Sequence, residues 1–136
     1  MTIHNNSVIS IFVIATKSYI DYALNLIKSS ARWTDTETQI QFLLLTDSEV
    51  DLGQLALEAS SITVTQFRIP SYGWPEATLL RFHLMVEHWD HVTGEIVMYL
   101  DADTEIVAPL NFFDLNGKLL LSSNSKINNN KIDLEL

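Results

Sequence analysis

The chain has 136 residues, of which 47% are hydrophobic, and its 17 acidic and 8 basic side chains give a formal net charge of −9. That length and hydrophobic content fit one globular domain with a buried core and exclude a chain that is disordered throughout. The acidic balance argues against nucleic acid or an anionic membrane surface as the main partner. Because the chain has no cysteine, disulfide frameworks and thiolate sites are excluded as well.

No apolar run in the sequence reaches membrane-spanning length. The N-terminal stretch "MTIHNNSV" also lacks the basic and apolar regions of a signal peptide. We therefore expect no transmembrane segment and a soluble, cytoplasmic protein.

The first predicted element is a strand over residues 7–16, "SVISIFVIAT". Its nearly continuous run of Val and Ile is typical of a strand covered on both faces, as in a parallel sheet. A helix follows over 19–33, because apolar residues there recur at helical spacing. Ser18 stands before this helix and Asp21 three residues later, so we expect a capping box at its start.

Three further elements are expected before the middle of the chain. They are a second buried strand over 39–47, a short helix over 49–59 and a less buried, alternating strand over 61–69. The order so far is strand, helix, strand, helix, strand, which is the pattern of an α/β fold.

The loop over 70–75 contains two prolines and a glycine, and Pro75 suits the first turn of a helix that runs to about Trp89. A fourth buried strand is predicted over 95–101, "EIVMYLD". Strands that alternate with helices in this way predict an α/β, Rossmann-like, mostly parallel sheet with flanking helices.

One domain is expected over residues 1–122. Near its end, "GKLLLSSN" at 117–124 is a candidate for one further strand. Residues 123–136 are polar and rich in asparagine, and we expect them to form a loose C-terminal tail.

Two aspartates, Asp101 and Asp103, end the fourth strand in "YLDADTEIV". Open α/β sheets bind ligands at the carboxyl ends of their strands, where this pair is expected to lie. Like charges so close repel each other, and a Mg²⁺ or Mn²⁺ ion that bridges them to a phosphate would cancel the repulsion. The alternative is that the aspartates cap the following turn. Their position after a buried strand favours the metal site.

Arg81 is a lone arginine between Leu80 and Phe82 in an otherwise apolar part of its helix. A guanidinium in such surroundings needs an anionic partner, and Asp103 or a phosphate would serve. The alternative is a surface arginine whose stem packs along the helix.

Other chemistries fit the sequence less well. His83, His88 and His91 suggest zinc, but only His88 and His91 share a helix face and no third ligand is apparent, so surface histidines are favoured. Neither a Gly-x-Gly-x-x-Gly motif nor a Walker loop occurs. A phosphatase of the haloacid dehalogenase type would have Thr or Val where Glu105 stands, and too little chain follows for its later catalytic loops.

Four motifs, "IATKSY", "FLLLTD", "WPEATLLRF" and "YLDADTEI", occur in this order between residues 7 and 107. Together they resemble glycosyltransferase family 6, the retaining α-galactosyl and N-acetylgalactosaminyl transferases of GT-A fold that include the blood-group enzymes. The specificity lies in the order: the loop tryptophan Trp74, Arg81 seven residues later, and Asp-x-Asp after the next strand. The resemblance implies a GT-A-like fold and a UDP-sugar donor whose hexose is transferred to a glycan acceptor.

The resemblance also implies roles for individual residues. Arg81 would face the donor diphosphate, Asp101 would contact the ribose or a metal-bound water, and Asp103 would ligate Mn²⁺ (or Mg²⁺) held by the diphosphate. The remaining members of the implied nucleotide-sugar site are Ile14, Ala15, Thr16 and Tyr19, which would line the uridine pocket, and Ala102. Bacterial relatives of the family often carry asparagines in place of both aspartates and work without metal, so the aspartates kept here favour metal dependence.

The sequence departs from the family in two respects. The animal enzymes carry a membrane anchor, and its absence from this sequence fits a bacterial or phage-like cytosolic form. The family's acceptor site and the glutamate beside the anomeric carbon lie well downstream of Asp-x-Asp, so we expect the C-terminal half of the fold to be incomplete here. The alternative is a non-catalytic nucleotide-binding or assembly module that kept the fold and lost turnover.

A shortened sheet would leave an edge and apolar surface uncovered. We therefore expect self-association as a homodimer or larger closed oligomer through segments after residue 104. The alternative is a monomer in which residues 108–136 fold back and cap the sheet.

Overall fold

The computed structural model describes residues 7–33, 38–55, 61–73, 75–108 and 110. Four parallel strands form one sheet in the order β3-β2-β1-β4. The strands and α-helices, in chain order, are β1 (Ser7–Ala15), α1 (Ile20–Ala31), β2 (Thr38–Thr46), β3 (Ile62–Arg68), α2 (Glu76–Glu87) and β4 (Ile96–Tyr99). Short 3-10 helices are η2 (Lys17–Tyr19), η3 (Leu52–Leu55) and η4 (Trp89–His91). The predicted α/β class, with a parallel Rossmann-like sheet and flanking helices, is confirmed.

Strand β1 lies inside the sheet and is covered on both faces, as its apolar run predicted. Alternate side chains of a strand point to opposite faces. Ile11 and Val13 belong to one apolar core with Leu26 of α1, whereas Phe12 belongs to a second core with Leu84 of α2. The strand therefore separates two cores, and a one-residue shift in its register would exchange them.

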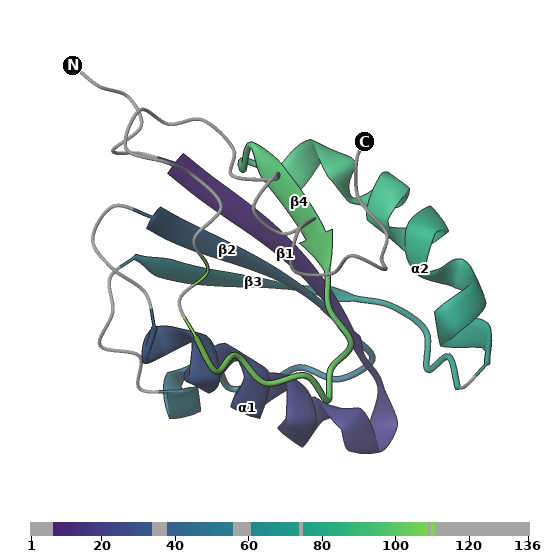
Figure 1. Ribbon diagram of the computed structural model, residues 1–136. Helices are drawn as coiled ribbons and strands as arrows, with labels where there is room; N and C mark the ends of the chain where they lie inside the picture. Colours follow the sequence, from purple (N-terminus) through teal and green to yellow (C-terminus); the bar gives the residue numbers. More distant parts are fainter. Residues whose placement is uncertain (1–6, 34–37, 56–60, 74, 109, 111–136) are drawn as a thin grey trace, which may run out of the picture.

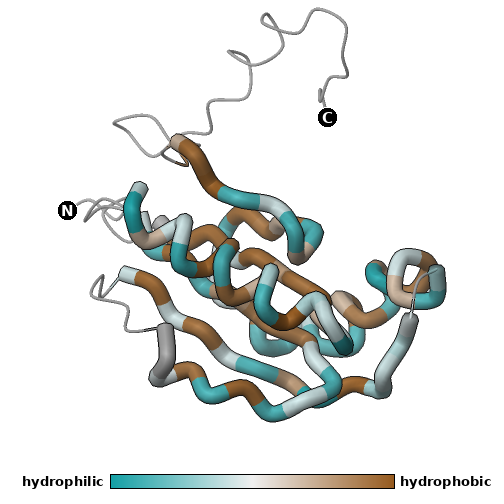
Figure 2. Tube along the Cα trace, turned by 90° about the horizontal axis from the view of Figure 1, so that it is seen from below, coloured by the Kyte–Doolittle hydropathy of each residue, from teal (hydrophilic) through white to brown (hydrophobic). Residues whose placement is uncertain are grey.

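The two α-helices cover opposite faces of the sheet, as the separate cores require (Figure 1). In Figure 2, apolar stretches run through the middle of the molecule and hydrophilic stretches lie mostly at its periphery. The described chain thus forms three layers, helix on sheet on helix.

The strand order creates a switch point between β1 and β4. From β1 the chain passes through α1 to β2 and β3, whereas β4 lies on the other side of β1. In open α/β sheets, the crevice at the carboxyl ends of two such strands is the usual place for a ligand.

The structure corrects three details of the sequence prediction. The helical segment begins with η2 at Lys17, and neither this segment nor α1 has a side-chain cap, so the capping box expected at Ser18 is wrong. The predicted helix over 49–59 is a 3-10 helix of four residues, with 56–60 outside the described residues. Strand β4, expected to be buried, is half-buried along its length because it is the edge strand of the described sheet.

Strand β3 behaves as predicted, with alternating exposure along its length at the opposite edge of the described sheet. Several other predictions fall outside the described residues: the strand at 117–124, the tail at 123–136, and most of the segments expected to mediate self-association or cap the sheet. Trp74, which contributes to the family resemblance, also lies outside them.

Candidate functional site

A cavity of about 380 Å³ lies at the carboxyl ends of β1 and β4, at the switch point. Three segments form its walls. The segment after β1 contributes Ile14, Thr16, Lys17, Ser18 and Tyr19; the loop before α2 and its first turn contribute Tyr72, Gly73, Ala77 and Thr78; and the segment from β4 contributes Tyr99, Asp101, Ala102 and Asp103. The volume is within the range of small-molecule sites, about 300–1,000 Å³.

Most of the site residues expected from the sequence line this one cavity. They are Ile14, Thr16, Tyr19, Asp101, Ala102 and Asp103. Two expected residues do not line it. Ala15 is buried in the core beneath α1, since its side chain points to the sheet face opposite that of Ile14. Arg81 lies on α2, beyond the helix turn that reaches the cavity.

Asp101 and Asp103 form one wall of the cavity, called the acidic wall below, and they stand on a turn that is anchored in the core. Ala102 is buried, and Ile106 packs in the same core, where its N–H donates to Ser29 Oγ at 2.8 Å. The Thr104 N–H donates to the backbone carbonyl of Asp101 at 3.0 Å and closes the turn. Within the described residues no hydrogen bond joins a backbone N–H to the Asp101 or Asp103 carboxylate, so neither acts as a turn cap there.

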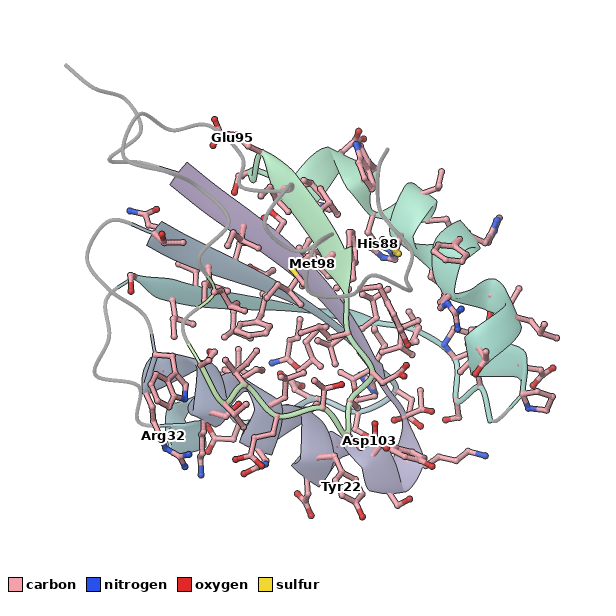
Figure 3. The ribbon with its side chains drawn as sticks, viewed as in Figure 1. Tyr22, Arg32, His88, Glu95, Met98 and Asp103 are labelled. Atoms are coloured by element: carbon pink, nitrogen blue, oxygen red, sulfur yellow. The ribbon has the colours of Figure 1, made fainter. Side chains whose placement is uncertain are left out.

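Asp103 is exposed on this turn, at the end of the sheet where α1 begins (Figure 3). Figure 3 also shows Glu95 at the opposite end of β4. The two carboxylates of the Asp-x-Asp motif are therefore presented to the cavity mouth by a buried alanine between them.

Tyr99 connects the acidic wall to Arg81. Burial raises the pKa of Tyr99 to about 12, and the negative charge of Asp101 and a hydrogen bond to its carboxylate act in the same direction. The Arg81 guanidinium lies 5.5 Å from the centroid of the Tyr99 ring and 5.0 Å from that of Phe82, within cation–π range. Arg81 thus contacts Tyr99, which lines the cavity, and does not line the cavity itself.

The opposite wall carries a cation that sequence reasoning missed. Lys17 has φ of 58°, a left-handed conformation that is uncommon for a residue other than glycine. Its Nζ lies 3.7 Å from the position that a Cβ on Gly73 would occupy, so the ammonium sits beside the loop that forms another wall. The cavity therefore has an acidic side, at Asp101 and Asp103, and a basic group at Lys17.

Asp47, at the end of β2, holds these walls together. Its carboxylate oxygens accept the Lys17 N–H at 3.2 and 3.3 Å and the Ser71 hydroxyl at 2.6 Å. The bond from Ser71 is the largest cause of a lowered pKa of Asp47; burial acts in the opposite direction, and the Lys17 N–H lowers the pKa further. A second tie joins the same two loops, since Thr16 Oγ1 donates to the Tyr72 carbonyl at 2.7 Å.

The Asp-x-Asp pair fits a metal site completed by a phosphate ligand better than a site made by protein side chains alone. Within the described part of the chain, no group of three His, Asp or Glu side chains could hold a metal ion by itself. Mg²⁺ and Mn²⁺, however, are commonly bound through one or two carboxylates together with substrate phosphates. The chemistry of Asp101 and Asp103 therefore suits a hard cation that arrives with a phosphate ligand.

The three histidines lie on α2 and the turn after it, away from the residues that line the cavity. The rings of His88 and His91 pack against Phe67, with centroid distances of 4.9 and 4.7 Å. His83 pairs with Glu87 one helix turn later, with 3.1 Å between Nε2 and Oε2. These contacts give the histidines packing and surface roles.

Comparisons with known proteins add no family: no protein-family model matches this sequence, and no curated protein matches it. None of the helices in the described ranges is both long enough and apolar enough to cross a membrane.

Proposed function

We propose that this chain is the nucleotide-sugar-binding part of a GT-A, family-6-like glycosyltransferase. Its ligand is a UDP-sugar, bound with Mn²⁺ or Mg²⁺ at Asp101 and Asp103. In a complete enzyme of this kind the hexose, galactose or N-acetylgalactosamine, would be transferred with retention to a glycan acceptor.

The observation that carries this proposal is the shared cavity. Ile14, Thr16 and Tyr19 come from one motif of the family resemblance, and Asp101 and Asp103 come from another more than 80 residues later in the chain. Both motifs line the same cavity at the switch point of the sheet, where nucleotides bind in folds of this class.

The chemistry of the walls is consistent with a ligand of mixed character. Tyr19 and Tyr72 offer aromatic surface for a base, and Lys17 offers a positive charge for a phosphate. A cation bound at the aspartates would neutralise charge on the diphosphate leaving group. The protein's own contribution there is to hold Asp101 and Asp103 on a turn that the buried Ala102 and Ile106 anchor in the core.

Sugar transfer also requires a positioned acceptor hydroxyl and a group opposite the leaving diphosphate that stabilises the oxocarbenium-like centre. The residues that line the described cavity offer candidates for binding the donor, and we assign no residue to these other two roles. The proposal is therefore donor binding, and turnover is a separate question.

Isothermal calorimetry with UDP and MnCl₂ tests the proposal. We expect saturable binding that weakens strongly when the metal is chelated. Asp90→Ala is a matched control, because Asp90 is exposed on η4, away from the cavity. Absence of binding at millimolar UDP, in a sample shown by circular dichroism to be folded, would overturn the proposal.

A hydrolysis assay on UDP-galactose and UDP-N-acetylgalactosamine, with and without acceptor sugars, then separates an active enzyme from a binding module. Release of UDP that depends on Mn²⁺ and on Asp103 would indicate turnover. Binding without release would indicate a module that holds the donor only.

A further inference from the structure

Lys17 adopts a backbone conformation that its residue type does not favour. An L-residue in the left-handed region is disfavoured by roughly 5- to 30-fold relative to its ordinary conformations. Such a conformation persists where the surroundings impose it, and strained conformations of this kind cluster at active sites and ligand-binding segments. At φ of 58°, Lys17 also directs its side chain to the loop around Gly73, and both residues line the cavity.

Asp47 is the group that accepts the Lys17 N–H. It lies at the end of β2, which is not a wall of the cavity, and it does not line the cavity itself. Its oxygens are engaged on three sides: Oδ1 accepts the Lys17 N–H and the Ser48 hydroxyl, and Oδ2 accepts the Ser71 hydroxyl. The Asp47 backbone carbonyl accepts Arg68 Nε at 3.1 Å, which ties the end of β3 to the same point.

We propose that Asp47 is a positioning residue of this cavity: it holds Lys17 in the left-handed conformation and holds the loop before α2 against it, so that the Lys17 ammonium faces an anionic ligand. Asp47 itself does not touch the ligand. The ligand part of this inference rests on the proposed function, whereas the conformational part can be tested in the free protein.

The free protein provides the first test. Backbone NMR chemical shifts of residue 17 report whether φ is positive. We expect the left-handed signature in the native protein, its retention in Asp47→Asn, which keeps a carbonyl oxygen as acceptor, and its loss in Asp47→Ala. If Asp47→Ala keeps the signature, the proposal is wrong. Should Asp47→Ala fail to fold, the same comparison is made with Asp47→Ser, whose hydroxyl is too short to bridge both loops.

Variants of Lys17 provide the second test. Lys17→Ala and Lys17→Gly both remove the ammonium that Asp47 is proposed to position. We expect Asp47→Ala to weaken binding of UDP with Mn²⁺ at least fivefold when Lys17 is present, and less than twofold in the Lys17→Ala and Lys17→Gly backgrounds. A role of Asp47 in stability alone would give equal losses in all three backgrounds, and that result would overturn the proposal.

The two measurements separate the possible failures. If the native protein binds no UDP, the proposed function fails while the chemical shifts still decide the role of Asp47. If UDP binds but Lys17 keeps positive φ without Asp47, the function stands and this inference fails.

Discussion

The two ends of the sheet use polar side chains in opposite ways. At the amino end, Gln41 accepts the Ser10 hydroxyl at 2.5 Å and the Thr93 N–H at 3.0 Å, and its amide donates to the His91 carbonyl at 2.8 Å. The Gly94 N–H donates to Ser10 Oγ at 2.8 Å. These groups join β1, β2 and the segment before β4, and they satisfy one another directly.

At the carboxyl end, the polar groups surround a cavity. Asp47 and Thr16 tie loops together there, but Lys17, Asp101 and Asp103 face open space. Hydrogen bonds that are satisfied within the protein stabilise the fold, whereas charges presented to a cavity cost stability and are available to a ligand. From this difference we infer that the polar groups at the amino end of the sheet stabilise the fold, whereas those at the carboxyl end bind a ligand.

Gly94→Ala, at the amino end of the sheet, should reduce the stability of the protein more than the other substitutions. A Cβ at this position would lie 2.6 Å from Ser10 Oγ, 2.7 Å from Ser10 N and 2.8 Å from the Val8 carbonyl oxygen. Two of these atoms are backbone of a central strand and cannot move aside. We expect a loss of about 3 kcal/mol in the free energy of unfolding, measured by urea denaturation.

Gly53→Ala is the control, because among the described residues a Cβ there would approach only the exposed side chain of Asp51, at 3.2 Å. We expect it to change stability by no more than about 0.5 kcal/mol. Equal effects of the two substitutions would contradict the close packing of Gly94 on β1.

Gln41→Ala should also reduce stability, by less than Gly94→Ala. It removes three hydrogen bonds that link the sheet to the segment before β4. We expect a loss of about 2 kcal/mol in the free energy of unfolding, with UDP affinity of the folded protein unchanged. Gln39→Ala, an exposed glutamine of the same strand, should have little effect. A change in affinity without a change in stability would contradict the division between the two ends.

Asp103→Ala, at the carboxyl end, should weaken ligand binding and leave stability nearly unchanged, which is the reverse of the effects expected at the amino end. The lost carboxylate is exposed on a turn that Ala102 and Ile106 anchor, so we expect stability to change by less than about 0.5 kcal/mol. Mn²⁺-dependent binding of UDP should weaken at least tenfold by calorimetry, because a metal ligand is removed. Unchanged affinity would mean that Asp103 is not a ligand.

Alkaline pH should test the acidic wall through the protonation of Tyr99. Because the pKa of Tyr99 is about 12 in the folded protein and 10.0 is its ordinary value, the folded state favours the protonated phenol. The associated stability is fully present below pH 10 and is lost as the pH rises toward 12. Tyr99→Phe should therefore lose less stability than the native protein between pH 10 and 12. Parallel pH profiles for the two proteins would contradict the burial of the phenol beside Asp101.

Local sequence patterns were enough to predict the elements and the acidic wall. The apolar run over 7–16 indicated a strand covered on both faces, and the two cores on either side of β1 bear this out. Asp101 and Asp103 were placed at the carboxyl end of a strand because strand ends can be read from where an apolar run stops. The same reasoning, applied to the end of the run at 39–47, would have singled out Asp47.

The capping box at Ser18 shows where such patterns mislead. Ser18 and Asp21 have the spacing of a cap, yet the helical segment begins at Lys17, within η2, two residues before the expected start at residue 19. The Thr16 hydroxyl before it donates to the Tyr72 carbonyl, a residue 56 positions away. A long-range contact thus decided how the helix starts.

What the sequence determined by itself was therefore the α/β class, the succession of strands and helices, and the aspartates at a strand end, since each depends on the periodicity of neighbouring residues. Tertiary structure alone decided the strand order, the cavity between β1 and β4, and the left-handed conformation of Lys17. It also placed Arg81 against Tyr99. The physical reason is that these features depend on contacts between segments far apart in the chain, such as Lys17 with Asp47, which no local pattern encodes.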